Sequence, residues 1–320
     1  RPGTILGLKS FVLTVMLCLR GKVMPELPEV ETIRLGLLTM LPGQVITSVE
    51  VETPKSFPND PDVVDTQMIG AKITDVDRRG KGLIIGLDTG YSLLIHLKMT
   101  GQLVFRFHTK TGAREGFGGG HPTDSLIGRL PDRSTRVSVG FDDGSKLFFN
   151  DQRKFGWVKL VETAKVAEDS FISKLGPEVL GPDFTFESFR QRLMRRRRTS
   201  IKAAIMDQSV MAGVGNIYAD EGLYAARIHP ATLVERVSAV KLRRLYEALR
   251  EVMQLSISLG GSSDKNYVDA EGKKGSYLTF AKVFRREGQE CERCGTQILK
   301  LRVAGRGTHI CPHCQREAKR

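Results

Sequence analysis

Four cysteines near the carboxyl end constrain the fold of this chain more than any other feature. They form two pairs, Cys291-x2-Cys294 and Cys311-x2-Cys314, with sixteen residues between them. This spacing is typical of a closed tetrahedral site in which four thiolates hold one structural Zn²⁺ ion. Free thiols or disulfides are the alternative. The pattern favours zinc and a reducing compartment, and losing a ligand should unfold the tail, because metal binding and folding are coupled in such modules.

The composition indicates a polyanionic partner. The 320-residue chain carries 49 Lys and Arg against 36 Asp and Glu, a net charge of +13. Such a balance favours nucleic acid, or else an anionic membrane surface. Membrane insertion is not expected, because no apolar run reaches the roughly 20 residues of a spanning helix. The length suffices for two domains with separate cores. Nothing in the sequence indicates an oligomer, and we expect a monomer.

Hydrophobic periodicity predicts a strand-rich first half. A helix is expected over 28–41, and alternation then predicts strands at 44–52, 71–78, 82–87, 91–97, 102–107, 136–141, 146–150 and 154–161. Residues 108–134 are rich in glycine and show no period, so we expect a loop there. The predicted fold class is α+β, with an N-terminal β-sandwich flanked by helices over 24–162.

The second half is predicted to be helical. From Phe186 onward, helical runs are expected at about 186–193, 201–208, 217–226 and 235–258. Gly176-Pro177 and Gly181-Pro182 interrupt the pattern before them, which predicts a linker over 163–184. A helical domain over 185–282 and a zinc module over 283–320 would complete the chain.

The stretch Met24-Pro25-Glu26-Leu27-Pro28-Glu29 carries candidate chemistry. In a chain that began at Pro25, the proline nitrogen would be a secondary amine, a nucleophile able to form a Schiff base. A terminal amine titrates near pH ~7.7–8.0, so much of it is neutral at physiological pH. Glu26 and Glu29 would place carboxyl groups beside it. The other interpretation is an ordinary helix start, with Pro28 and acidic residues in the first turn.

Residues 1–23 precede this stretch and need a separate interpretation. Lys9 is followed by the apolar run 11–19, which has the length of a signal-peptide core but no small-residue cleavage site after it. We interpret 1–23 as a mis-called extension, with translation starting at Met24. Export is the alternative, and it would separate the basic chain from an intracellular polyanion.

Two glycine-rich motifs would suit phosphate binding. Between the cysteine pairs, Val303-Ala-Gly-Arg-Gly-Thr-His309 would project Arg306 from a tight turn. Further upstream, Val210-Met-Ala-Gly-Val-Gly-Asn-Ile-Tyr218 lies between two predicted helical runs, and its glycines followed by Asn216 offer backbone amides to an anion. A plain hairpin and a plain helix–turn–helix corner are the alternatives. The arginine run 195–198 would by itself be a solvated surface.

Together these motifs resemble the formamidopyrimidine-DNA glycosylase family, which opens Met-Pro-Glu-Leu-Pro-Glu-Val-Glu-Thr, as residues 24–32 do here. The resemblance covers essentially all of 24–320, with 108–133 poorly matched. It implies a bifunctional glycosylase and AP lyase that removes oxidised purines from double-stranded DNA in base excision repair. It also implies a helix–two-turn–helix domain, a zinc finger holding one Zn²⁺, and a location in the bacterial cytoplasm at the nucleoid.

The resemblance implies roles for matching residues of this sequence. The implied catalytic residues are Pro25, Glu26, Glu29, Lys81 and Arg306. The implied DNA-binding residues are His96, Met99, Arg153, Phe155, Arg197, Lys202 and Asn216. Met99, Arg153 and Phe155 would fill the gap that an extruded nucleotide leaves in the stack. Without the resemblance, Met99 and Phe155 would be interpreted as core, and the basic cluster 78–81 as surface.

Some positions depart from the family pattern. Residues 260–277 resemble the loop that closes over a flipped purine, yet Lys274 and Ser276 differ from the proline and aromatic residue of some relatives. Relatives often carry histidines where Ser134 and Thr135 stand here. Two other functions stay open. One is a sister glycosylase for oxidised pyrimidines, and the other is a non-catalytic damaged-DNA-binding protein, which is expected if residues 1–23 stay attached. Leu27 and Val30 in the opening stretch favour the purine enzyme.

Overall fold

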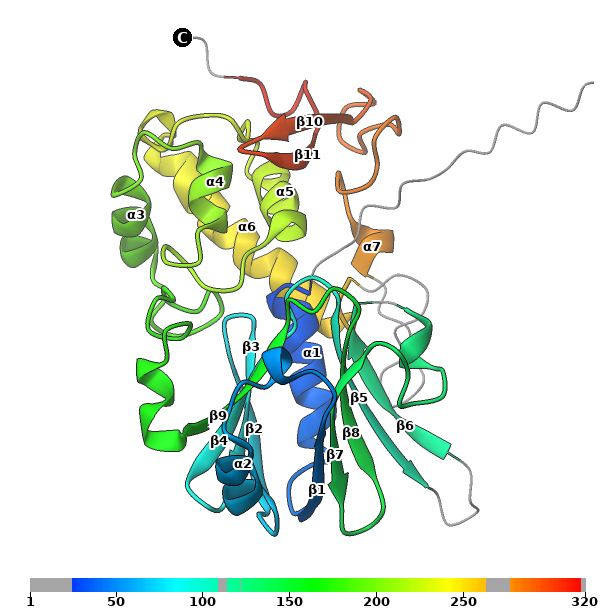
Figure 1. Cartoon of the computed structure of the whole chain (residues 1–320). Coiled ribbons are helices and arrows are strands. Elements are labelled where there is room, and N and C mark those ends of the chain that lie inside the picture. Colours follow the sequence, from blue (N-terminus) through cyan, green and yellow to red (C-terminus); the bar gives the residue numbers. More distant parts are fainter. Residues whose placement is uncertain (1–24, 109–113, 122, 263–276, 318–320) are drawn as a thin grey trace, which may run out of the picture.

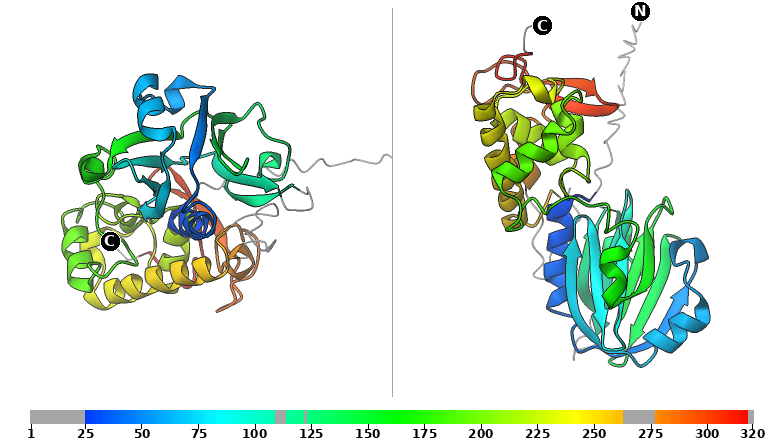
Figure 2. Two further views of the ribbon diagram at one scale, coloured as in Figure 1. Left: turned by 90° about the horizontal axis from the view of Figure 1, so that it is seen from below. Right: turned by 90° about the vertical axis from the view of Figure 1, so that its left-hand side faces the viewer.

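The computed structural model describes residues 25–108, 114–121, 123–262 and 277–317 (Figure 1). The predictions for residues 1–23 and for most of the loop 260–277 lie outside these ranges. The described chain forms two lobes, one built of sheets and one of helices with a β-hairpin (Figure 1). Figure 2 shows a narrow waist between the lobes, where one end of helix α1 lies.

Within the described residues of the first lobe, nine strands form two antiparallel sheets. The sheets have the orders β1-β7-β8-β5-β6 and β2-β3-β4-β9. The strands are β1 Ile46–Val51, β2 Ile73–Arg79, β3 Gly82–Leu87, β4 Tyr91–His96, β5 Gly101–His108, β6 Arg114–Gly120, β7 Thr135–Phe141, β8 Lys146–Asp151 and β9 Trp157–Glu162. Apolar side chains of both sheets and of helix α1 (Leu27–Leu38) share one buried core. The predicted sandwich is confirmed.

Strand β6 corrects the expectation of a loop over 108–134. It pairs with β5 in antiparallel register, with Phe117 opposite Phe105. Its glycines conceal it from pattern analysis, because a period of two is visible only where side chains alternate. A side chain at Gly116 would collide with the backbone of Phe105, so the glycines are needed for the close pairing. Phe117 is buried in the core, and its ring lies against Gly36 of α1.

Helix α2 (Pro61–Met68) was not predicted. Asp60 caps it by accepting the N–H of Asp62 at 2.9 Å. The helix buries only Val64 and Met68, which is too few positions to show a helical period.

The second lobe holds the four predicted helices, and a short helix α7 that was not predicted, around a separate core. They are α3 Phe186–Met194, α4 Ile201–Met206, α5 Asn216–Ala225, α6 Ala239–Ser258 and the short α7 Tyr277–Phe280. Helix α6 begins later than predicted, because the Ser238 hydroxyl caps it by accepting the N–H of Lys241. Val179 and Phe184 already belong to this core, and the linker at 163–184 stays a prediction. No helix in the described ranges is long and apolar enough to cross a membrane.

The zinc module carries a β-hairpin of β10 (Leu299–Val303) and β11 (Arg306–Ile310). Its two-residue turn consists of Ala304 and Gly305, with φ of 48° and 76°. Positive φ at both central residues matches the right-handed twist of the paired strands. The hairpin packs against helix α5.

The contact of α1 with β6 yields a stability prediction. A methyl group added at Gly36 would overlap the ring of Phe117. In an open helix Gly→Ala stabilises by about 1 kcal/mol, but overpacking a core costs about 1–3 kcal/mol. We therefore expect Gly36→Ala to lower the melting temperature. In a Phe117→Leu background the same change should be neutral or stabilising. An equal loss in both backgrounds would contradict this packing.

Candidate active site

The first turn of α1 is fixed to the helical lobe by backbone contacts. Pro25 and Glu26 precede the helix, and both are buried. The N–H of Glu26 donates to Glu29 Oε2 at 2.8 Å, so the expected helix-start capping is present. Glu26 Oε1 accepts the N–H of Ile217 at 3.0 Å, from the start of α5. The N–H of Leu27 donates to the Gly213 carbonyl at 3.2 Å. A helix cap can form at the surface, so capping alone does not explain why the Glu26 carboxyl group is buried.

Glu26 has the properties of a proton donor. Burial raises its pKa to about 7, the charge of Lys81 opposes the shift, and Glu29 adds to it. Among the described residues its Oε2 has no hydrogen-bond partner. A side chain at Gly215 would overlap this carboxyl group, so the glycine makes room for it. A carboxyl group that is half protonated near neutral pH and keeps one oxygen free can serve as a general acid.

Lys81 faces the same backbone from the turn between β2 and β3. Its Nζ is buried and donates to the Val214 carbonyl at 3.0 Å. Burial lowers the pKa of Lys81, while the charges of Glu26 and Glu29 raise it. The structure thus brings together Glu26, Glu29 and Lys81, three of the residues for which the family resemblance implies a catalytic role.

Glu29 connects this cluster to helices α5 and α6. Its Oε1 accepts the hydroxyl of Tyr218 at 2.6 Å and the N–H of Ser262 at 2.8 Å. The Tyr218 hydroxyl also lies 2.6 Å from that of Ser256. Burial raises the pKa of Tyr218, so its hydroxyl keeps its proton. Sequence analysis missed Tyr218, although it lies in the quoted glycine-rich motif, because a tyrosine on a helix usually packs in a core.

An ion-pair cluster joins the lobes behind Lys81. Arg78 lies 2.7 Å from both Glu31 and Glu178, and Arg79 lies 2.9 Å from Glu178. The N–H of Gly80 donates to the same Glu178 carboxylate. The basic cluster is therefore partly buried and paired, unlike the solvated surface that it would otherwise suggest. Glu178 was missed, since its Gly-Pro neighbours indicated only a linker.

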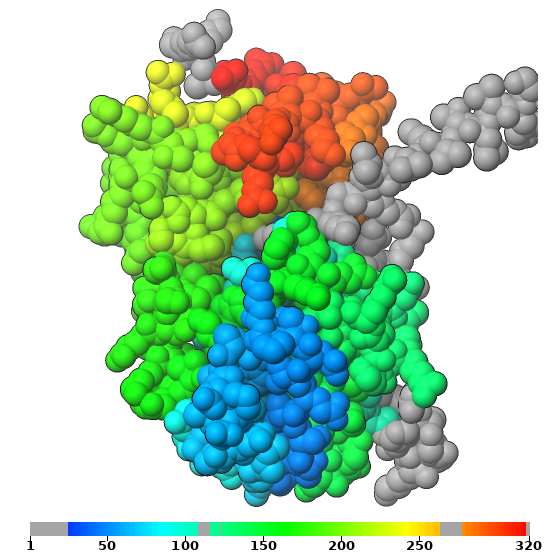
Figure 3. All heavy atoms as spheres, in the orientation of Figure 1, coloured from blue at the N-terminus to red at the C-terminus, as the bar shows by residue number. Residues whose placement is uncertain are grey.

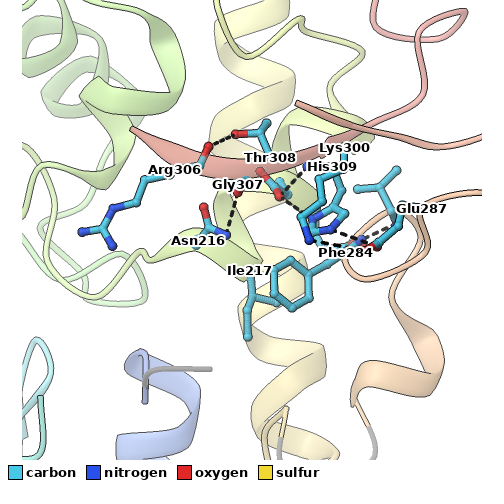
Figure 4. A network of polar contacts seen from close by, with 12 residues as sticks. Asn216, Ile217, Phe284, Glu287, Lys300, Arg306, Gly307, Thr308 and His309 are labelled. Carbon is cyan, nitrogen blue, oxygen red and sulfur yellow. Dashed lines mark hydrogen bonds and ion pairs between the residues drawn. The ribbon is translucent and has the colours of Figure 1, made fainter. Parts of the chain in front are cut away.

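The hairpin presents Arg306 beside the start of α5. Figure 4 shows the Arg306 side chain extending away from the hairpin, close to Asn216. Asn216 Nδ2 donates to the Gly307 carbonyl at 3.0 Å. Arg306 is exposed, and its charge contributes to lowering the pKa of Lys81. Both residues stay predicted phosphate ligands.

Lys202 requires a correction. Its side chain is wholly buried, and its Nζ donates to Asp220 Oδ1 at 2.6 Å and to the Thr308 hydroxyl at 2.7 Å. The other Asp220 oxygen accepts the N–H of His309 at 2.9 Å. Lys202 therefore ties the hairpin to α4 and α5 instead of contacting DNA from the surface. A buried charge requires such a partner. Asp220 was missed because a lone acidic residue on a helix resembles a surface position.

The turns that follow β4 and β8 face the helical lobe (Figure 1). Met99 lies in the first of these turns and Arg153 and Phe155 lie in the second, and their side chains are in contact. Arg153 Nη1 is 3.1 Å from Met99 Sδ, and the guanidinium carbon is 4.8 Å from the centroid of the Phe155 ring. Phe155 is 51% exposed, so it does not belong to the core. An exposed ring beside a thioether and a cation can enter a base stack.

His96 and Arg197 occupy different environments. His96 is buried against Trp157 and Phe171, with ring centroids 5.8 and 4.8 Å away. Burial lowers its pKa to about 3, with help from the charges of Lys98 and Lys81, so the imidazole is neutral. Its Nδ1 accepts the N–H of Lys98 at 2.9 Å, which supports the turn carrying Met99. Arg197 is exposed.

The four cysteines fit one zinc ion. Their sulfurs all lie within 4.8 Å of one another. The Sγ–Sγ distance is 3.9 Å for Cys291 and Cys314, 3.5 Å for Cys294 and Cys311, and 3.6 Å for Cys294 and Cys314. A tetrahedron with Zn–S bonds of about 2.3 Å has sulfurs about 3.8 Å apart. The site is closed and structural, and it holds the base of the hairpin.

Models of known families match the chain in three consecutive parts. The N-terminal domain of formamidopyrimidine-DNA glycosylase matches residues 24–158. The H2TH domain of the same enzyme matches 175–267, and the zinc finger found in FPG and IleRS matches 288–316.

Individual relatives cover nearly the whole chain. Formamidopyrimidine-DNA glycosylase of Heliobacterium modesticaldum is 40% identical over 295 residues, 92% of this chain and 100% of that protein. The enzyme of Herpetosiphon aurantiacus is 41% identical over 91% of this chain and 100% of its own. Lactococcus lactis Fpg bound to abasic-site DNA is 33% identical with a TM-score of 0.80, covering 92% of this chain and 100% of its own. MutM bound to carbocyclic 8-oxo-G DNA is also 33% identical, with a TM-score of 0.78 and the same coverage. This chain therefore belongs to the formamidopyrimidine-DNA glycosylase family.

Proposed function

We propose that this protein is a bifunctional DNA glycosylase and AP lyase. It excises oxidised purines, such as 8-oxoguanine and formamidopyrimidines, from double-stranded DNA in base excision repair. The observation that carries the proposal is the buried cluster at the waist. Pro25 adjoins Glu26, whose pKa is about 7 and whose Oε2 is unpaired among the described residues, and Lys81 faces the same backbone segment. The similar proteins bound to abasic and 8-oxo-G DNA support the substrate class.

The chemistry uses the proline nitrogen once no residue precedes it. The amine attacks C1′ of the extruded nucleotide, and the base leaves with the glycosidic electron pair and takes up the proton that the amine releases. Glu26 gives its proton to the sugar ring oxygen, the C1′–O4′ bond breaks to leave a hydroxyl group, and the nitrogen lone pair forms the iminium. The resulting iminium acidifies the C2′ protons. β-Elimination and then δ-elimination follow, and leave a one-nucleotide gap. Lys81 assists the first elimination and Arg306 the second.

DNA binds across the waist in this proposal. Figure 3 shows the hairpin of the upper lobe facing the loops of the lower lobe across the waist. Arg197, Asn216 and Arg306 contact phosphates, while Met99 and the turn 152–156 enter the stack. The charge of +13 implies strongly salt-dependent binding. The protein acts as a monomer in the bacterial cytoplasm, at the nucleoid.

Borohydride trapping tests the nucleophile. Protein that begins at Pro25 should give a covalent adduct with an 8-oxoguanine duplex, because borohydride reduces the iminium. The same protein with residues 1–24 attached should give none, because the Pro25 nitrogen is then an amide. An adduct of equal yield from both forms would place the Schiff base elsewhere.

The lesion class is tested in the same assay. Duplexes with 8-oxoguanine and with thymine glycol are compared at equal enzyme. We expect faster release of the purine, and faster release of thymine glycol would favour the pyrimidine enzyme. Binding of both lesions without release of either would indicate a non-catalytic protein.

The raised pKa of Glu26 yields a pH prediction. The protonated, proton-donating form predominates below about pH 7 and is lost as pH rises through that value. The terminal amine loses its proton over a similar range, which increases the rate with pH. Glu26→Gln, which cannot titrate, should lower the single-turnover rate of base release. It should also abolish the decline of that rate above about pH 7. The same decline in the variant would show that Glu26 is not its source.

Loss of zinc should abolish DNA binding while the β-sandwich stays folded. Cys294→Ser removes one ligand and should release the metal, since four thiolates close the site. Arg306→Ala serves as the control. It should retain zinc and reduce the slope of log affinity against log salt by about 1. Metal content and titrations with an abasic-site duplex measure both effects. Full binding by zinc-free Cys294→Ser would contradict this role of the module.

A further inference from the structure

Met99, Arg153 and Phe155, here called the wedge cluster, share one buried anchor. Met99 lies in the turn between β4 and β5, and the other two lie in the turn between β8 and β9. Asp151, the last residue of β8, is 1% exposed. Its carboxylate lies beneath both turns.

The Asp151 carboxylate is fully engaged with the two turns. Its Oδ2 accepts the N–H groups of Phe155 at 2.8 Å and Gly156 at 2.7 Å. Its Oδ1 accepts the N–H of Arg153 at 3.1 Å and the hydroxyl of Thr100. The Thr100 hydroxyl also accepts the N–H of Arg153 at 3.0 Å. An ionised carboxylate offers about four acceptor positions, and here all are used. One side chain therefore connects the turn of Met99 to that of Arg153 and Phe155.

Both turns contain a residue in the left-handed backbone region. Lys98, just before Met99, has φ of 51°, and Lys154, between Arg153 and Phe155, has φ of 56°. Residues other than glycine keep such conformations only where the surroundings impose them. The N–H groups held by Asp151 flank Lys154, and the N–H of Lys98 is held by His96.

The anchor itself is fixed in the sheet. The N–H of Asp151 donates to the Ser134 carbonyl at 2.7 Å, and its own carbonyl accepts Nε of Arg136 at 2.8 Å. Gly156, at the other end of the turn, has no room for a side chain, because one would press on the Phe149 ring and the His96 carbonyl. The carboxylate is thus a fixed point from which the wedge cluster projects.

We propose that Asp151 is a positioning residue for extrusion of the damaged nucleotide. It holds two separate turns so that the wedge cluster enters the duplex as one preorganised unit. The inference rests on the function proposed above, because a wedge is needed only where a base leaves the stack. Asp151 touches no reacting atom, so its effect belongs to the opening of the duplex and not to the elimination steps.

Asp151→Asn is the discriminating variant. It keeps the size of the side chain but turns an amide group toward backbone N–H donors. We expect single-turnover excision of 8-oxoguanine from a duplex to fall about tenfold to a hundredfold, the range for a misplaced positioning element. Cleavage of a preformed abasic site in a single strand should be unchanged, because no base has to leave a stack. Unchanged excision, or equal losses of both activities, would overturn the proposal.

Asp143→Asn is the matched control. Asp143 also accepts a turn N–H, that of Ser145 at 2.8 Å, and it accepts Nε2 of Gln44 at 3.1 Å. Asp143 lies in the turn between β7 and β8, at the end of β8 that is opposite Asp151. Asp143→Asn should therefore leave both activities intact. Adding Phe155→Ala to Asp151→Asn should cause little further loss, because residues acting as one unit are not additive. Full additivity would count against the shared anchor.

Failure of the proposed function can be separated from failure of this inference. A wild-type protein beginning at Pro25 that released no base would contradict the function. In that case 2-aminopurine beside the lesion still reports unstacking without chemistry. A fluorescence rise with the wild type that is lost in Asp151→Asn would support the anchor. No rise with the wild type, or an equal rise with both, would overturn it.

Discussion

The contact between the start of α1 and the backbone of residues 213–217 is the constraint on which the site depends. Glu26, Leu27 and Lys81 all bond to this backbone segment. The approach is possible because side chains at Gly213 and Gly215 would overlap Leu27 and Glu26. Close approach excludes water from the Glu26 carboxyl group, and that desolvation raises its pKa. Because Gly213 and Gly215 of the helical lobe have no side chains, α1 can pack this closely, and the protonation state of Glu26 follows from that packing.

Periodic side chains made most of the fold predictable, and the exceptions have physical reasons. The strands with alternating apolar residues and the long helices lie close to their expected places. Strand β6 was missed because its glycines remove the alternation that identifies a strand. Lys202 was misassigned because its environment is non-local. It follows a run of arginines, yet its partners lie 18 and 106 residues away along the chain. Sequence near a lysine does not reveal whether a distant aspartate will neutralise it.

The zinc site could be predicted from neighbouring residues in the sequence, but the state of the Pro25 nitrogen and the exposure of Phe155 could not. Ligand spacing within one small module was enough to predict the zinc geometry. No residue pattern, in contrast, reveals whether the Pro25 nitrogen is free. Phe155 is apolar and would be assigned to a core on composition alone, and only the family resemblance placed it in a DNA-facing cluster. Its exposure depends on how Asp151 and Gly156 shape the turn, which is a property of the folded sheet.

The ion pairs of Glu178 with Arg78 and Arg79 restrict movement of the two lobes relative to each other. Arg78 and Arg79 are tied to Glu178, and Lys81 is tied to Val214, so the tip of the β2–β3 hairpin is fastened to the helical side. A movement of one lobe against the other would therefore have to break these contacts or carry this tip along with the helices. The same contacts hold Lys81 and Glu26 against one backbone segment, so the two groups are already assembled in this structure.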